Sequence, residues 1–229
     1  STIAEEKKFL IKTKQKKILI TTNEFPFTLG RIDGVPRGKK QVNGYKNFIK
    51  DFIKNLNKKI LNNLEIKNAY THNQFVLGGN KIKNENEDYL KGYSNIEKAL
   101  KKNFPRLKIF YDKRPAFQIR DKYNLQIETM DGTGFLESLA LNNPVMLVYK
   151  PQFFQHDKKA KKFFDELKKV QIVFDNEKKA ADFINKNFEK IAIWWKNKKL
   201  QKAREKFCNR YARFSNEPLK EIRSCLEFK

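Results

Sequence analysis

Apolar residues follow two patterns along the chain, short continuous runs and longer stretches with helical spacing. Residues 17–22 form the first continuous run, which is typical of a buried strand. Between positions 45 and 61 an apolar residue recurs every three or four positions, which predicts an amphipathic helix. A second strand is predicted at 64–70. This part of the chain therefore predicts a strand, a helix and a strand in succession.

The middle of the chain is more polar. Residues 71–92 predict an extended loop. Loops of this length in compact domains are usually functional or mobile. Ser94 is predicted to cap a short helix that Pro105 ends. A third strand at 107–111 and a short helix at 114–122 are predicted to follow.

The clearest unit comes next. Residues 125–130 predict a strand, 131–134 a tight turn and 135–141 a helix, which an Asn-Asn-Pro sequence ends. The elements predicted after it are a strand at 145–149, a helix at 158–169, a strand at 170–174, a helix at 177–193 and two helical segments within 198–226, separated near Pro218.

Strands and helices alternate about six times, and the strands are expected to be continuous apolar runs. This predicts an α/β fold with a doubly wound, mostly parallel, six-stranded Rossmann-like sheet, with helices on both faces and the strand order 3-2-1-4-5-6. Residues 1–15 are expected to be a lead-in linker or helix, and 16–229 one domain. Ligands of such folds bind at the carboxyl ends of the strands.

Composition adds a strong positive charge. The chain has 229 residues, with 50 Lys and Arg against 26 Asp and Glu, a net charge of +24. An aromatic content of 13% indicates a folded protein rather than a disordered one. Only nine of the basic residues are Arg, and Lys shares A/T-rich codons with the abundant Asn, Ile and Phe, so a compositional bias accounts for most of the charge. Nucleic-acid binding and attraction to an anionic membrane surface are the alternatives.

Several protein classes are excluded. No run approaches the roughly 18 apolar residues of a membrane-spanning helix, and residues 1–17 are too charged for a secretory signal. The chain begins at Ser1 without a Met, from which we expect either a trimmed chain or an excised segment of a longer protein. Cys208 and Cys225, without a CxxC sequence, support neither a disulfide framework nor a zinc site. We expect a protein of the cytoplasm or the inner membrane surface that needs no metal and no cofactor.

The turn between the strand at 125–130 and the next helix is the most informative motif. Asp131-Gly132-Thr133-Gly134 would let a ligand approach the backbone and the amides at the helix start, and Thr133 adds a hydroxyl that can cap the helix or bind phosphate. Glu137, one turn further, could bind sugar or ribose hydroxyls. The alternative is a plain helix cap with Glu137 in solvent. The motif is neither a Walker loop nor GxGxxG.

In its context this motif resembles a known family. Residues 128–145 are similar to the donor-site segment of GT-B glycosyltransferases. More narrowly, the chain resembles bacterial transferases found with surface-polysaccharide genes, distant relatives of capsule Kdo transferases and CDP-glycerol glycerophosphotransferases. Trp194-Trp195 and residues 206–213 are similar to further sequence segments of that family. Because members are longer, the chain would be the C-terminal, nucleotide-sugar-binding lobe with its lead-in.

The resemblance implies a donor site. Arg31 would face the donor phosphates, and Lys67 and Asn68 stand where the family often has an Arg. The family usually has a Tyr or Pro before the glycine, where Asp131 stands here. The residues implied to contact the donor are Asp131, Gly132, Thr133, Gly134 and Glu137.

Other residues allow two interpretations each. His72 and His156 are weak catalytic candidates, because each falls in a loop on the expected ligand side, but each also fits a solvated loop histidine. Trp194-Trp195 fits a core or interlobe anchor better than a sugar-stacking platform. The helix that carries three arginines fits a solvated face, or a patch for a missing N-terminal lobe or an anionic membrane. These arginines are Arg204, Arg210 and Arg213.

The resemblance, together with the turn at 131–134, implies a glycosyltransferase-like protein that moves a sugar from a nucleotide-sugar onto a cell-envelope polysaccharide. The expected partners are the nucleotide-sugar, a glycan or lipid-linked acceptor, the missing N-terminal lobe and an anionic membrane surface. No nucleic acid is expected. The alternatives are a basic nucleic-acid-binding module, for which charge is the only support, and a GT-B-type nucleotide-sugar epimerase.

Overall fold

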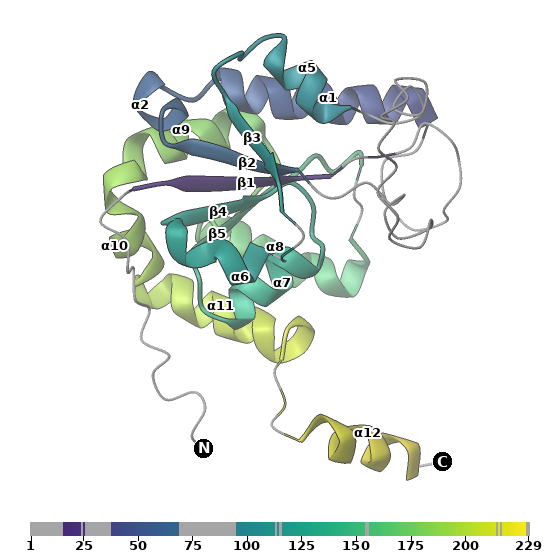
Figure 1. The fold of residues 1–229 in the computed structure, drawn as a ribbon. Helices are drawn as coiled ribbons and strands as arrows, with labels where there is room; N and C mark the ends of the chain where they lie inside the picture. The colour runs from purple at the N-terminus through teal and green to yellow at the C-terminus, as the bar shows by residue number, and fades with distance from the viewer. Residues whose placement is uncertain are drawn as a thin grey trace.

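A computed structural model shows a six-stranded sheet in which every pair of neighbouring strands is parallel (Figure 1). The strand order β3-β2-β1-β4-β5-β6 confirms the predicted doubly wound α/β fold. The strands are β1 (Ile18–Thr22), β2 (Leu64–Asn68), β3 (Lys108–Tyr111), β4 (Leu125–Glu128), β5 (Val145–Val148) and β6 (Val173–Phe174). The structure describes residues 16–23, 25, 38–68, 95–112, 114, 116–153, 156–213, 215 and 217–227.

Helices cover both faces of the sheet, because alternate residues of each strand point to opposite faces. On one face α1 (Gly38–Lys54) and α9 (Glu177–Asn187) enclose the larger apolar cluster (Figure 1). On the other face α7 (Thr133–Ala140), α8 (Lys158–Lys169) and α11 (Lys198–Tyr211) enclose a second one. The shorter helices are α2 (Lys58–Leu61), α5 (Ile96–Lys101), α6 (Ala116–Ile119), η1 (Arg120–Lys122), η2 (Phe188–Lys190), α10 (Ile191–Trp195) and α12 (Pro218–Glu227).

The helix predicted over 45–61 is in fact two helices. α1 begins earlier than the apolar spacing predicts and ends at Lys54. Asn57 then caps α2, because its side chain accepts a hydrogen bond from the amide of Ile60 at 3.0 Å. The side chain of Asn185 accepts from the amide of Asn57 at 2.9 Å, so α9 fixes the break from outside.

Two further boundaries differ from the prediction. α5 is capped by Asn95 and not by Ser94, which lies outside the described residues. Asn95 adopts a left-handed φ of 46°, which its short polar side chain tolerates. The strand predicted at 170–174 shortens to the two residues of β6, because Gln171 also has a positive φ, 64°.

Trp194 and Trp195 anchor the core, as predicted. The helix predicted over 177–193 consists of α9, η2 and α10, and α10 carries both tryptophans. Trp195 is fully buried, and its Nε1 donates to the carbonyl of Asn142 at 3.1 Å. Trp194 donates to the carbonyl of Val170 at 3.3 Å and packs against both apolar clusters.

Arg204 does not belong to a surface patch, so that prediction is wrong for this residue. It is buried on α11, and its Nη1 donates to the carbonyl of Leu139 at 2.8 Å, near the C-terminal end of α7. The backbone amide of Asn142 also donates to this carbonyl, at 3.0 Å, so the guanidinium adds a second, charged donor at the negative end of the helix. Arg210 is exposed, and Arg213 pairs with Glu221 of α12. α11 thus packs within this domain, and contact with a further lobe stays a prediction.

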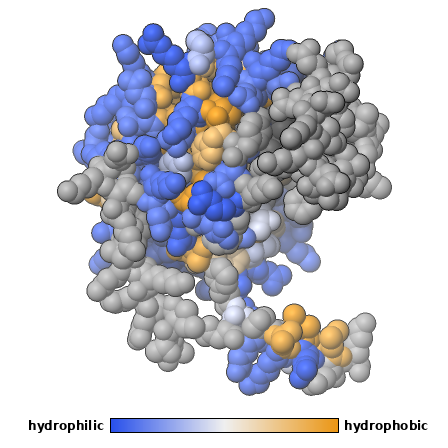
Figure 2. All heavy atoms as spheres, viewed as in Figure 1, coloured by the Kyte–Doolittle hydropathy of each residue, from blue (hydrophilic) through white to orange (hydrophobic). Residues whose placement is uncertain are grey.

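α12 presents an apolar surface. Leu219, Ile222 and Leu226 are 73%, 56% and 70% exposed, and apolar surface is visible on this helix in Figure 2. Figure 1 shows α12 apart from the layers around the sheet. None of the described helices is both long and apolar enough to cross a membrane.

β2 and β4 are not the continuous apolar runs that the sequence analysis expected. Their sequences, Leu-Glu-Ile-Lys-Asn and Leu-Gln-Ile-Glu, place polar residues at alternate positions on one face of the sheet. At the amino end of this face, Glu65 accepts hydrogen bonds from Lys17 (3.0 Å), Lys108 (2.8 Å) and Tyr123 (2.6 Å). Burial alone would raise the pKa of Glu65, but these hydrogen bonds lower it to about 2.

Candidate functional site

The turn after β4 places the start of α7 at the carboxyl edge of the sheet. α7 begins at Thr133, and Gly132 is its N-cap, with an extended backbone (φ −78°, ψ −172°). Of the two alternatives for the Thr133 hydroxyl, helix capping does not occur, because Thr133 is already the first helical residue and the N-cap makes no side-chain hydrogen bond. The first amides of α7 and the positive end of its dipole therefore face the edge without a side-chain cap.

Gly134 allows α7 to approach the end of β4 closely. A Cβ atom at this position would lie 2.7 Å from Oε1 of Glu128, closer than side chains pack. At Gly132, by contrast, the nearest atom to an added Cβ would be Cγ of Met130 at 3.9 Å. The sequence predicted ligand contact for both glycines. The structure gives Gly134 a packing role of its own.

Glu128 is the buried carboxylate beneath the start of α7. The Thr21 hydroxyl and the Gln126 amide both donate hydrogen bonds to it, and its residue is 6% exposed. Burial raises the pKa of Glu128, and these two neutral donors only oppose the shift. Glu128 therefore binds its proton more tightly than an ordinary carboxyl group.

Lys67 and Glu137 extend this cluster. Lys67 follows the same face of β2, and burial lowers its pKa, while the charges of Asp112 and Glu128 raise it. Glu137 lies one turn into α7, and burial raises its pKa. Its charge also acts on Glu128, so the two carboxyl groups lie close enough to interact. The predicted Glu137 thus lies within electrostatic range of Glu128 at this edge.

Asp131 and His156, both predicted site residues, are brought together. Oδ2 of Asp131 lies 2.8 Å from Nε2 of His156, although 25 positions separate them in the chain. The imidazole stacks on Phe164 of α8, with ring centroids 3.6 Å apart and planes 8° apart. The His156 side chain is 9% exposed, which contradicts a solvated loop histidine. Two loops, after β4 and before α8, are therefore joined beside the start of α7.

A second network ties the ends of β1 and β4 to α1. The Tyr45 hydroxyl lies 2.6 Å from Oγ1 of Thr129, which donates to the carbonyl of Thr21 at 2.9 Å. The backbone amide of Asn23 donates to the same Tyr45 hydroxyl at 3.3 Å. The carboxyl edge is thus held by α1 on one side and by α8 on the other.

Three more residues were singled out from the sequence: Arg31, His72 and Asn68. Arg31 and His72 lie outside the described residues, so their predicted roles stay predictions. Asn68 is fully buried at the end of β2, where its Oδ1 accepts from the Thr22 hydroxyl at 2.9 Å. Among the residues that the structure describes, no three His, Cys, Asp or Glu side chains gather as a metal site would require.

Sequence reasoning missed Glu128 and the Asp131–His156 pair. Alternation of polar and apolar residues in β4 was the available signal for Glu128, because it marks a polar position at the end of a buried strand. Both loops that carry Asp131 and His156 lie near neighbouring strands, β4 and β5. The predicted strand order already placed β4 beside β5, but it did not predict that Asp131 and His156 would be in contact.

Comparison with known proteins bears on the whole chain. The family model described as LIC12162 family transferase matches residues 1–226. No curated protein and no solved structure gives a match.

Proposed function

The chain belongs to the LIC12162 family of transferases, and we propose that it moves a sugar from a nucleotide-sugar donor to a cell-envelope glycan or lipid-linked acceptor. The donor binds where α7 begins, beside the ends of β4 and β5. The observation that carries this proposal is the Asp131–His156 pair next to the uncapped first turn of α7. Asp131, which holds His156, precedes the amides and the hydroxyl at the start of α7 by two residues, and such a set of donors suits a sugar phosphate.

Recognition of the phosphate begins with the backbone. The amides of Thr133 and Gly134 lie in the first turn, where a helix leaves its N–H groups without internal partners. The exposed Thr133 can donate its hydroxyl to the same phosphate. Arg31 is proposed as a further cation for the donor phosphates, on the resemblance to GT-B enzymes alone.

His156 is proposed to stabilise the leaving group. In the reaction an acceptor hydroxyl attacks the anomeric carbon, the carbon–oxygen bond to phosphate breaks, and the phosphate departs with the electron pair. His156, held by Asp131 and by the Phe164 ring, would donate a hydrogen bond from its ring to the departing phosphate. The proton of the acceptor passes to a base outside this site.

Glu137 is proposed to recognise hydroxyl groups of the donor. It is partly exposed, one turn after the phosphate site, and accepts hydrogen bonds as a carboxylate or donates one when protonated. Glu128, which is buried, does not reach a ligand. It supports the first turn of α7 from beneath, through its contact with Gly134.

Calorimetric titration with CMP-, CDP- and UDP-sugars tests the donor site. We expect one of these donors to bind, Thr133→Ala to weaken it about threefold to tenfold, and His156→Gln to weaken it about tenfold, since each removes a polar contact with the phosphate. Lys162→Gln, which changes an exposed cation on α8, is the control. If no nucleotide-sugar binds, or if His156→Gln and Lys162→Gln behave alike, the proposed donor site is wrong.

A further inference from the structure

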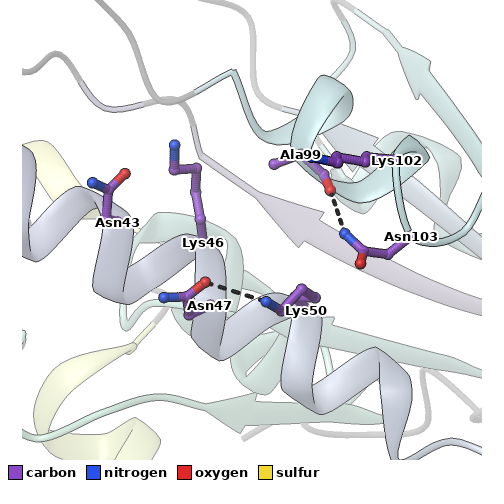
Figure 3. Close-up of a pocket in the computed structure, with 7 residues that line it drawn as sticks. All are labelled: Asn43, Lys46, Asn47, Lys50, Ala99, Lys102 and Asn103. Carbon is purple, nitrogen blue, oxygen red and sulfur yellow. Dashed lines mark hydrogen bonds between the residues drawn. The ribbon is translucent and has the colours of Figure 1, made fainter.

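A hollow of about 460 Å³ lies between α1 and α5, away from the start of α7. This volume falls within the range of small-ligand pockets, about 300–1,000 Å³. Figure 3 shows the side chains from the two sides of the hollow. Its polar lining residues are Asn43, Lys46, Asn47 and Lys50 of α1, with Lys102 and Asn103 directly after α5.

The lining has a distinctive chemistry. Of the seven described residues that line the hollow, three are lysines and three are asparagines, and none of the seven is acidic, an arginine or aromatic. Lysines attract carboxylates or phosphates as point charges, and asparagine amides both donate to and accept from hydroxyl groups. Single-stranded nucleic acids, by contrast, are usually bound by aromatic side chains that stack on their bases. The lining therefore suits a glycan with acidic groups better than a nucleic acid.

The position of the hollow connects it to the carboxyl edge. Asn43 and Lys46 flank Gly44 and Tyr45 on α1. Tyr45 contacts Thr129 at the end of β4, and Gly44 meets the ring of Phe153 in the loop between β5 and α8. From there the α1 wall runs from Asn43 to Lys50, about 10 Å along the helix axis. One end of the α1 wall therefore lies near the carboxyl edge of the sheet.

We propose that this hollow binds an acidic segment of the acceptor glycan. Its lysines neutralise carboxylates or phosphates on successive sugars, and its asparagines hold their hydroxyls. The polymer then leads from the hollow toward the carboxyl edge of the sheet. The acceptor role rests on the proposed glycosyl transfer, whereas the binding of an acidic glycan does not.

Binding of an oligogalacturonate by the full chain tests this proposal, with a neutral malto-oligosaccharide of the same length for comparison. A triple variant, Lys46→Gln, Lys50→Gln and Lys102→Gln, is expected to weaken acidic-glycan binding about tenfold at about 50 mM salt. The matched control changes Lys198, Lys199 and Lys202 of α11 to Gln, which removes the same charge from exposed positions elsewhere on the domain. We expect that control to lose less than about twofold.

A second pair of variants keeps the test independent of lysine packing. Ala99, which also lines the hollow, is changed to Glu or to Gln, two side chains of equal size. Ala99→Glu is expected to weaken acidic-glycan binding at least fivefold relative to Ala99→Gln, since only Glu places a negative charge there. Circular dichroism of every variant confirms that it is folded.

Three outcomes overturn the inference: no preference for the acidic over the neutral glycan, equal losses in the two lysine triples, or tighter binding of a single-stranded oligonucleotide that the hollow variants alone abolish. The donor titration is a separate measurement. If no nucleotide-sugar binds but the acidic glycan binds in the hollow, the proposed transfer reaction fails and this site stands.

Discussion

Glu65 and Glu128 lie on the same face of the sheet, one near the amino ends of the strands and one at the carboxyl edge. Both are largely buried, yet their pKa values shift in opposite directions. Glu65 has two ammonium groups and a phenol as partners, whereas Glu128 has a hydroxyl and an amide. The partners, and not burial alone, decide which carboxyl group keeps its charge.

The two carboxyl groups therefore have different roles: Glu65 stabilises the fold through its ion pairs, and Glu128 supports the start of α7. The ion pairs of Glu65 join β2 to β3 and to the residue before β1, far from the proposed ligand edge. Glu128 instead sits under the first turn of α7, where a full negative charge would oppose the binding of a phosphate. A carboxyl group that holds its proton tightly can support the helix with less repulsion of the ligand.

Enlarging Gly134 should have the largest effect on this arrangement. The Cβ of Gly134→Ala would meet the Glu128 carboxylate at 2.7 Å and push α7 from β4. We expect a loss of about 2 kcal/mol in the free energy of unfolding, measured with urea, and weaker donor binding. Gly132→Ala is the matched control and should lose under about 1 kcal/mol, since its Cβ has a nearest neighbour at 3.9 Å. Equal losses in the two variants would contradict the packing role.

Removing the charge of Glu65 should have an intermediate effect. Glu65→Gln leaves Lys17 and Lys108 without their carboxylate, but both lysines reach solvent. We therefore expect a loss of only about 1–2 kcal/mol at pH 7 in urea unfolding. Asp165→Asn, which removes the acidic partner of Lys161 from a surface ion pair on α8, is the control and should lose under about 0.5 kcal/mol.

The pH dependence of the same variant sharpens the comparison. The folded pKa of Glu65 is about 2, below the ordinary value of 4.5, so its contribution is complete above pH 4.5 and is lost as the pH falls toward 2. The wild type and Glu65→Gln should therefore converge in stability near pH 2. A constant difference between pH 7 and pH 2 would show that the charge of Glu65 is not what stabilises the fold.

Neutralising Glu128 should have the smallest effect at neutral pH. Its folded pKa is raised, so the contribution of Glu128 is present below the unfolded pKa and is lost as the pH rises through the folded pKa. Glu128→Gln should change the stability by less than about 0.5 kcal/mol near pH 5 and become relatively more stable than the wild type as the pH rises. Urea unfolding between pH 5 and 9 measures this trend. If Glu128→Gln instead became less stable relative to the wild type as the pH rises, this prediction would be wrong.

The sequence predicted the frame of the molecule better than its polar contacts. Strand order followed from the alternation of apolar runs and helical stretches, and the turn at 131–134 was placed at the carboxyl edge. The Asp131–His156 contact depends instead on how two loops fold over Phe164, which no spacing encodes. In the sequence Arg204 cannot be distinguished from the other basic residues of its helix. Its burial depends on the carbonyl of Leu139, which is distant in sequence.

The close approach of Phe153 to Gly44 couples the position of α1 to that of the segment after β5. Because an added Cβ at position 44 would stand 2.7 Å from the Phe153 ring, this ring has little room to move independently of α1. A ligand in the proposed acceptor hollow that shifted α1 would therefore shift Phe153 as well. By thermodynamic reciprocity, the proposed acceptor and the proposed donor would then change each other's affinity by the same factor.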